Sequence, residues 1–322
     1  MTSYQNGFVA LNSAAFLLDQ RDNQEMSLAN LFRLISLAAI WGASFAFMRV
    51  VAPVFGEIGT MWLRIGIAGF ALFVYALITR EQLALAHHWK HYLFIGLLSS
   101  ALPFALFAYA MKTLPAGYGA ILNATAPFFG ALFAAWMIGE RLTAMRIVGL
   151  VIGFFGVALI VNLGSVDLSP EVAIAVGACI VATACYGFIS VFIKKYVKNA
   201  PNMGLAAGTL MLASVATAPI AIPLTNWAWP SLTVALCLLA LALLCSSVAY
   251  VLYYRLIVDV GPTKAISVTF LVPFFGVIWG GIFFGERLTL GAIVGGLLVL
   301  YGMTLVLGLH PSWAPKLKES PR

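Results

Sequence analysis

The sequence predicts an all-α polytopic membrane protein with ten transmembrane helices, arranged as two inverted five-helix repeats. The 322 residues are 62% hydrophobic and only 9% charged, with a mean hydropathy of +1.01. Soluble domains carry about 25% charged residues. The apolar runs have the length of membrane-spanning helices. Two nearly identical stretches, PFFGALFAAWMIGERLT (127–143) and PFFGVIWGGIFFGERLT (273–289), indicate an internal duplication.

Ten apolar segments of about 20 residues follow one another along the chain, each long enough to cross the hydrocarbon layer. The first five expected spans are Leu34–Val54, Ile58–Ile78, Tyr92–Met111, Tyr118–Ile138 and Thr143–Leu163. The second five are Val172–Ile193, Met203–Leu224, Leu232–Leu256, Ala265–Phe284 and Leu290–Leu309. Pro53 and Gly56 end the first span, because both residues favour breaks in helices.

These segments divide the chain into an N-terminal tail (1–32), a first repeat (33–165), a second repeat (166–309) and a C-terminal tail (310–322). The first 25 residues contain no segment long enough to span a membrane and do not resemble a signal peptide. Two interpretations of them stay open: a disordered tail, or a chain that starts at Met26 instead of Met1.

The predicted topology follows from the number of spans and from the basic residues. Because each repeat has an odd number of spans, the second must enter the membrane from the opposite side, an arrangement typical of transporters. A cytoplasmic N-terminus places most of the 18 lysines and arginines on the cytoplasmic side. The exceptions are Arg49, Arg64, Lys112 and Arg287. We therefore expect both termini in the cytoplasm and the bundle in the plasma membrane.

The stretch YAMKTLPAGYGAILNATAPFFGALFAAWMIGERLT and its second copy, YRLIVDVGPTKAISVTFLVPFFGVIWGGIFFGERLT, carry a family resemblance. With Trp41-Gly42 and the ten-span frame, they resemble the two EamA domains of the drug/metabolite transporter superfamily, over roughly residues 33–308. The resemblance implies a permease of the bacterial inner membrane that moves small metabolites, often exporting amino acids. It also implies a cavity lined largely by the third, fourth, eighth and ninth helices.

Two prolines mark the middle of equivalent spans. Pro127 lies about 20 Å of helix before Glu140, and Pro273 lies equally far before Glu286. A proline frees the carbonyl four residues earlier, which belongs to Asn123 in one repeat and to Thr269 in the other. These carbonyls and side chains suit a polar substrate cavity, and the alternative is a kinked helix with tight packing.

Further candidates for substrate binding are polar and aromatic residues within the spans. Serines pair across the repeats, and some aromatics do so as well, although serine often serves helix packing and aromatics often mark interfaces. The candidates of this kind are Ser99, Ser100, Ser246, Ser247, Trp41, Tyr109, Tyr186, Tyr250 and Trp279.

Arg64 is the charge deepest within a predicted span, and an intramembrane charge indicates function. It could receive a substrate carboxylate, or its side chain could extend to the outer interface. The spans contain no Asp or Glu, and we find no metal-ligand spacing or phosphate-binding glycine loop. We therefore predict no metal, no cofactor, no embedded enzyme and no partnership with nucleic acid.

The repeated ending GERLT has two interpretations. In the first, Gly139 and Gly285 end one helix, and Thr143 and Thr289 cap the next, which makes a tight hairpin. In the second, the Glu and Arg side chains make gating contacts between the halves. Glycine pairs with GxxxG spacing, such as Gly149 and Gly153, predict close helix contacts, which we expect within one chain.

These observations favour a secondary transporter or facilitator that exports a small metabolite such as an amino acid by alternating access. Two alternatives stay open: efflux of lipophilic compounds, and a membrane scaffold or receptor that transports nothing. The expected partners are a small-molecule substrate and the lipid bilayer. The sequence leaves the oligomeric state open, a monomer included.

Overall fold

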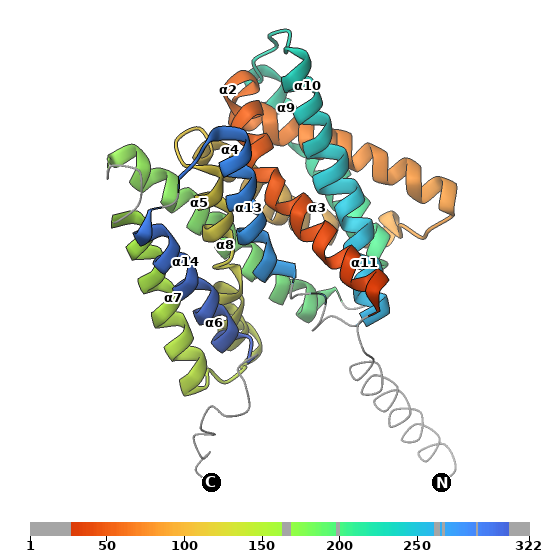
Figure 1. Cartoon of the computed structure of the whole chain (residues 1–322). Helices are drawn as coiled ribbons and strands as arrows, with labels where there is room; N and C mark the ends of the chain where they lie inside the picture. The colour runs from red at the N-terminus through yellow and green to blue at the C-terminus, as the bar shows by residue number, and fades with distance from the viewer. Residues whose placement is uncertain are drawn as a thin grey trace, which may run out of the picture.

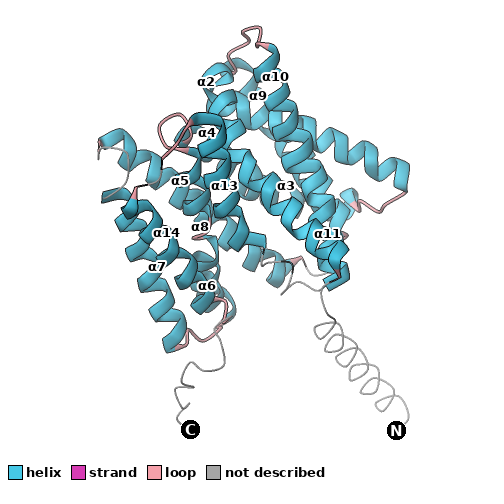
Figure 2. Ribbon diagram, in the orientation of Figure 1, coloured by secondary structure: helices cyan, strands magenta, loops and turns pink. Residues whose placement is uncertain are grey.

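The computed structural model of the chain describes residues 27–162, 169–197, 200–260, 265, 268–287 and 289–308. All regular secondary structure in these residues is helical (Figure 2). The predictions for residues 1–26 and for the C-terminal tail lie outside the described residues. The helices of the first half are α2 (Leu28–Thr79), α3 (Leu85–Gly96), η1 (Leu97–Ala101), α4 (Leu102–Ala110), α5 (Ala116–Asn123), α6 (Ala126–Ile138) and α7 (Ala144–Asn162).

The second half contains the helices of the other five predicted spans. Its helices are α8 (Pro170–Tyr196), η2 (Gly204–Gly208), α9 (Thr209–Leu224), α10 (Leu232–Leu239), η3 (Ala240–Val248), α11 (Ala249–Val260), α13 (Val268–Phe284) and α14 (Leu290–Val306). The first two predicted spans lie within α2, and each later span coincides with one of the other helices or with a consecutive run of them. Six helical stretches of the described residues are long and apolar enough to cross a membrane, and three shorter apolar helices accompany them. The number of ten crossings therefore stays a prediction.

The first two predicted spans form the two limbs of α2, which folds back on itself (Figure 1). Gly56 has φ 73° and ψ 167°, a conformation that glycine adopts without steric cost. The break therefore falls where the sequence predicts it. Residues 28–55 form the first limb and residues 57–79 the second.

Each half packs its first helix against the fourth helix of the other half. A Cβ atom on Gly42 of α2 would lie 2.8 Å from the backbone nitrogen of Gly276 in α13. A Cβ atom on Gly187 of α8 would lie 2.5 Å from the nitrogen of Gly130 in α6. Gly42 and Gly187 follow the aromatic residues that match across the repeats, so the two halves exchange equivalent contacts.

The last helices of the two halves, α7 and α14, lie side by side (Figure 1). A Cβ atom on Gly149 would lie 2.7 Å from the Gly302 oxygen, and one on Gly156 would lie 2.6 Å from the Gly295 oxygen. Residue numbers rise along one helix as they fall along the other, so α7 and α14 are antiparallel. The close glycine contacts lie within one chain, as expected. The hairpins that precede α7 and α14 therefore lie at opposite ends of the bundle.

Candidate functional site

Arg64 lies in the second limb of α2, eight residues after the break at Gly56, and its side chain is buried, with 4% of its surface exposed. Its Nε donates a hydrogen bond of 3.0 Å to Ser246 Oγ. Its Nη1 lies 3.7 Å from the Met48 sulfur, and its guanidinium carbon lies 3.7 Å from the centre of the Phe104 ring. Arg64 therefore faces the interior of the bundle, and the alternative of a side chain extending to the interface is wrong.

No acidic residue of the described part of the chain pairs with Arg64. Glu57, Glu140, Asp259 and Glu286 form ion pairs with other basic residues, and the two remaining described acids, Glu81 and Glu171, are exposed. Burying an ion costs several kcal/mol unless a counter-charge compensates it. The bundle thus holds a buried cation whose protein partners are neutral.

The four predicted serines lie in two π-helical stretches, η1 and η3. Ser246 Oγ donates to Leu241 O at 3.2 Å within η3, five residues back, and accepts the bond from Arg64. Ser247 Oγ donates to Ala68 O at 3.2 Å and so ties η3 to the second limb of α2. In the first half, Ser99 and Ser100 lie in η1, with their hydroxyls 3.4 Å apart. Short π-helical segments inside α-helices often mark functional sites.

Cys245 and two tyrosines also lie near the guanidinium. Tyr186 of α8 and Tyr250 of α11 lie close enough to Arg64 for electrostatic interaction, and Tyr250 also interacts with the side chain of Ser100. Four regions of the fold, two from each half, therefore meet here. We call this group the Arg64 site, and it consists of Arg64, Ser100, Phe104, Tyr186, Ser246 and Tyr250.

The other predicted site residues lie in different surroundings. Trp41 packs against Tyr253 with ring centres 5.3 Å apart, and Trp279 Nε1 donates to Ala39 O at 2.9 Å. These contacts tie the first limb of α2 to α11 and α13. Tyr109 is half-buried in α4, and no described contact brings it to the Arg64 site.

The two prolines act differently, although the sequence places them identically. In the first half the helix breaks between α5 and α6, and Pro127 lies in the first turn of α6. Asn123 ends α5, and its half-buried amide forms no hydrogen bond with the described part of the chain. In the second half Pro273 is buried inside a continuous α13, with Thr269 near its start. The equivalent prolines therefore lie in a broken helix in one half and in a continuous helix in the other.

Sequence reasoning missed Phe104, Met48, Thr125 and Thr183. Phe104 lies four residues after Ser100, a spacing that puts both on one helix face and could have indicated it. Thr125 and Thr183 are buried, with their hydroxyls 3.0 Å apart across α5–α6 and α8. Met48 carries no such signal, because only the fold-back of α2 brings it to Arg64.

Both interpretations of the repeated GERLT ending have structural support. Gly139 and Gly285 adopt φ of 71° and 63°, and the hydroxyls of Thr143 and Thr289 accept backbone bonds from residues three positions later. These hairpins are confirmed.

The glutamates of the hairpins also bridge the two halves. Glu286 forms an ion pair with Arg49 and accepts bonds of 2.8 and 3.2 Å from the nitrogens of Ala116 and Gly117. Glu140 accepts a bond of 2.7 Å from Lys194 Nζ.

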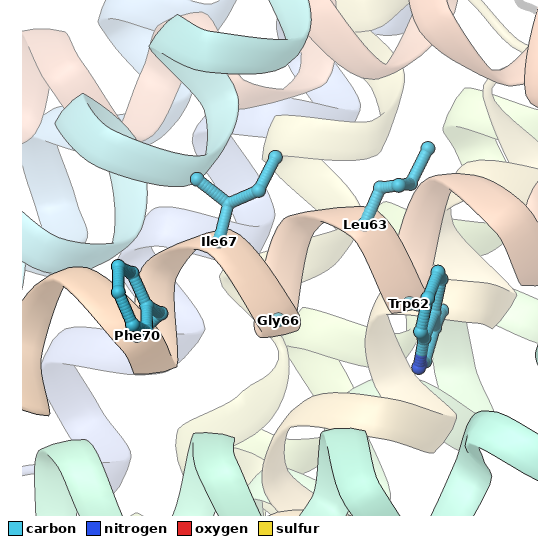
Figure 3. Close-up of a pocket in the computed structure, with 5 residues that line it drawn as sticks. All are labelled: Trp62, Leu63, Gly66, Ile67 and Phe70. Atoms are coloured by element: carbon cyan, nitrogen blue, oxygen red, sulfur yellow. The ribbon is translucent and has the colours of Figure 1, made fainter.

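A pocket also opens on the second limb of α2, lined by Trp62, Leu63, Gly66, Ile67 and Phe70 (Figure 3). It contains none of the predicted site residues. Its lining is apolar apart from the Trp62 indole, whose N–H already donates to Ser214 O at 3.1 Å. The described side chains of this pocket therefore offer a polar solute no free hydrogen-bonding group.

The fold is that of a polytopic membrane protein built from two repeats. Its helices are long and apolar, its halves make equivalent contacts with each other, and a cation is buried between them. The model of the EamA-like transporter family matches residues 29–162 and 173–308. The chain therefore belongs to the EamA-like transporter family, and it is a membrane transporter.

Two relatives that are named as transporters match this chain over most of their own length. The uncharacterized transporter YoaV of Bacillus subtilis is 24% identical over 276 residues, which cover 84% of this chain and 94% of that protein. The uncharacterized inner membrane transporter YedA of Escherichia coli K12 is 27% identical over 261 residues, covering 80% and 83%. A crystal structure aligns with a TM-score of 0.63 at 16% identity, covering 87% of this chain and 97% of that one, a likeness of fold alone.

Proposed function

We propose that this chain is a secondary transporter of the plasma membrane that exports a small metabolite, such as an amino acid, by alternating access. The observation that carries the proposal is the pair of ion contacts between the halves. Arg49 with Glu286, and Lys194 with Glu140, each join the first helix of one half to the glutamate hairpin of the other. Because the two hairpins lie at opposite ends of the bundle, the contacts join the halves at opposite ends.

In this mechanism the two contacts open in turn. Breaking the Arg49–Glu286 contact releases the first limb of α2 from α5 and α13, and breaking the Lys194–Glu140 contact releases α8 from α6. The equivalent glycine contacts, Gly42 on Gly276 and Gly187 on Gly130, serve as pivots of similar geometry. With both termini cytoplasmic, the Lys194–Glu140 contact faces the cytoplasm.

Transport by the reconstituted chain tests the function. Liposomes containing the purified protein are loaded with a panel of radiolabelled amino acids and related metabolites, and efflux is compared with empty liposomes. We expect efflux of at least one solute. If only lipophilic dyes move, the alternative of lipophilic efflux replaces this proposal. If nothing moves, the scaffold or receptor alternative does.

A reversible cross-link tests alternating access. All four native cysteines are replaced by alanine, and Arg49→Cys is combined with Glu286→Cys. A short reducible bifunctional thiol reagent should stop efflux, and a reductant should restore it. The matched control is Glu57→Cys with Lys112→Cys, since these residues also form an ion pair, at 3.0 Å, but within one half. Unchanged efflux in the cross-linked Arg49 and Glu286 variant would contradict the mechanism.

A further inference from the structure

We propose that Arg64 binds the carboxylate of the transported solute, so that the substrates are small organic carboxylates, zwitterionic amino acids included. The inference rests on the proposed transport function and adds the chemical class of the substrate. Arg64 is a buried cation, and the described acids are either paired with other basic residues or exposed. A bound anion would supply the counter-charge that these residues do not.

The contacts of the guanidinium leave its donors unequally satisfied, which favours a particular kind of anion. Phe104 covers one face of the group, and Nε is committed to Ser246. The donors at the Nη edge meet only the weak acceptor sulfur of Met48 among the described residues. A guanidinium edge donates two parallel bonds to the two oxygens of a carboxylate. A cationic solute would be repelled, and a neutral one would leave the charge uncompensated.

The neighbouring aromatic groups suit the remainder of such a solute. Tyr186 stacks on Phe107 with ring centres 6.3 Å apart, and Tyr250 packs near Tyr254 at the same separation. Pockets for small metabolites combine such apolar walls with a few polar groups that fix orientation. The Arg64 site therefore favours an amphipathic monoanion over a highly charged solute. Inorganic anions share the negative charge, so the experiment must separate them from carboxylates.

Thermal unfolding of the purified full-length protein tests the inference without a known substrate. Melting is followed at fixed ionic strength in rising concentrations of benzoate, benzamide, L-phenylalanine, L-phenylalaninamide, phosphate and chloride. Benzoate and benzamide have nearly the same shape, so they differ mainly in charge. We expect benzoate and L-phenylalanine to raise the melting temperature saturably. Benzamide, L-phenylalaninamide, phosphate and chloride should cause no saturable rise.

Three variants connect that shift to Arg64. Arg64→Gln should abolish it. Arg64→Lys keeps the charge but loses the two parallel bonds, so half-saturation should require about tenfold more benzoate. The matched control is Arg255→Lys, because Arg255 is exposed on the helix that carries Tyr250. It should respond as the wild type does. If Arg64→Gln fails to fold, Arg64→Lys carries the test.

Several results would overturn the inference. Equal responses to benzoate and benzamide, or no response to either carboxylate, would show that no carboxylate site exists. A saturable, Arg64-dependent response to phosphate or chloride alone would show an anion site of another class. Unchanged half-saturation in Arg64→Lys would also overturn it. If the protein exports solutes but binds no carboxylate, this inference is wrong and the proposed transport function stands. If it binds carboxylates but exports no solute, the proposed transport function is wrong and the carboxylate site stands.

Discussion

Glu286 forms an ion pair with Arg49, and the two residues belong to different repeats. The same carboxylate accepts backbone bonds from Ala116 and Gly117, which begin α5. A carboxylate at the start of a helix satisfies backbone donors and interacts favourably with the helix dipole. One side chain from the repeated hairpin therefore joins three segments of the bundle.

The Glu286→Ala variant should be less stable than the wild type by about 1–3 kcal/mol, because two backbone donors and a guanidinium lose their acceptor together. The measurement is thermal or denaturant unfolding of the purified protein. Arg287→Ala is the matched control, since Arg287 is the exposed neighbour in the same hairpin. Equal stability of the two variants would contradict the bridging role of Glu286.

The contact of Glu140 predicts a dependence on pH. The hydrogen bond from Lys194 holds the pKa of the Glu140 carboxyl below its usual value of 4.5. Because the pKa in the folded state is depressed, the stabilisation is fully present above about pH 4.5 and is lost as pH falls through the folded value. The side chain is 35% exposed, so the effect should be at most about 1 kcal/mol.

Comparing wild type with Glu140→Gln between pH 7 and pH 3 checks this prediction. The difference in melting temperature should be present at pH 7 and should shrink below about pH 4.5. In a protein that carries Lys194→Gln, adding Glu140→Gln should change the melting temperature much less, because the main cause of the Glu140 pKa shift is already absent. A difference that stays constant over the whole range would contradict the assignment.

Most of the helix boundaries could be predicted from the sequence, because the length of an apolar segment and the residues Gly56, Gly139 and Gly285 determine local structure. The sequence also indicated Arg64, because a charge within an apolar span is conspicuous. It could not predict which residues surround Arg64. Those contacts depend on how the limbs of α2 fold back and on how the first helix of each half packs against the fourth helix of the other.

The two proline segments show why a repeat does not guarantee equal structure. Thr125 lies at the break between α5 and α6 and contacts Thr183 of α8. At the equivalent positions of the other repeat stand Leu271 and Ala38, which share an apolar cluster. A polar contact accompanies the broken helix and an apolar contact accompanies the continuous one. The shared proline alone therefore does not determine whether the helix breaks.

Alanine at Gly187 should destabilise the bundle by about 1–3 kcal/mol, because a Cβ atom there would meet the backbone of Gly130 at 2.5 Å and force the helices apart. Gly177→Ala is the matched control on the same helix, since no atom lies within 4 Å of a Cβ atom at that position. It should be neutral or slightly stabilising, because alanine favours helix. Thermal unfolding of both variants decides, and equal melting temperatures would contradict the close crossing.

The threonine contact predicts a measurable coupling between the halves. Each hydroxyl lies 3.0 Å from the other, and each also lies within bonding distance of a carbonyl in its own chain segment, Leu122 O at 2.8 Å and Ile180 O at 2.9 Å. Thr125→Val and Thr183→Val keep the side-chain shape and remove one hydroxyl each. Because the hydroxyl that remains in each single variant can still donate to its local carbonyl, we expect single losses of about 1 kcal/mol.

The double variant should lose less than the sum of the single losses, by about 0.5–1 kcal/mol, since the two hydroxyls share one hydrogen bond. The free energy of unfolding is measured for the wild type, both single variants and the double variant, and these four values give the coupling energy. Ser190→Ala combined with Thr183→Val is the control, because the Ser190 hydroxyl bonds only to Gly187 O of its own helix among the described residues. Additive losses for Thr125 and Thr183 would show that the two hydroxyls are close without being coupled.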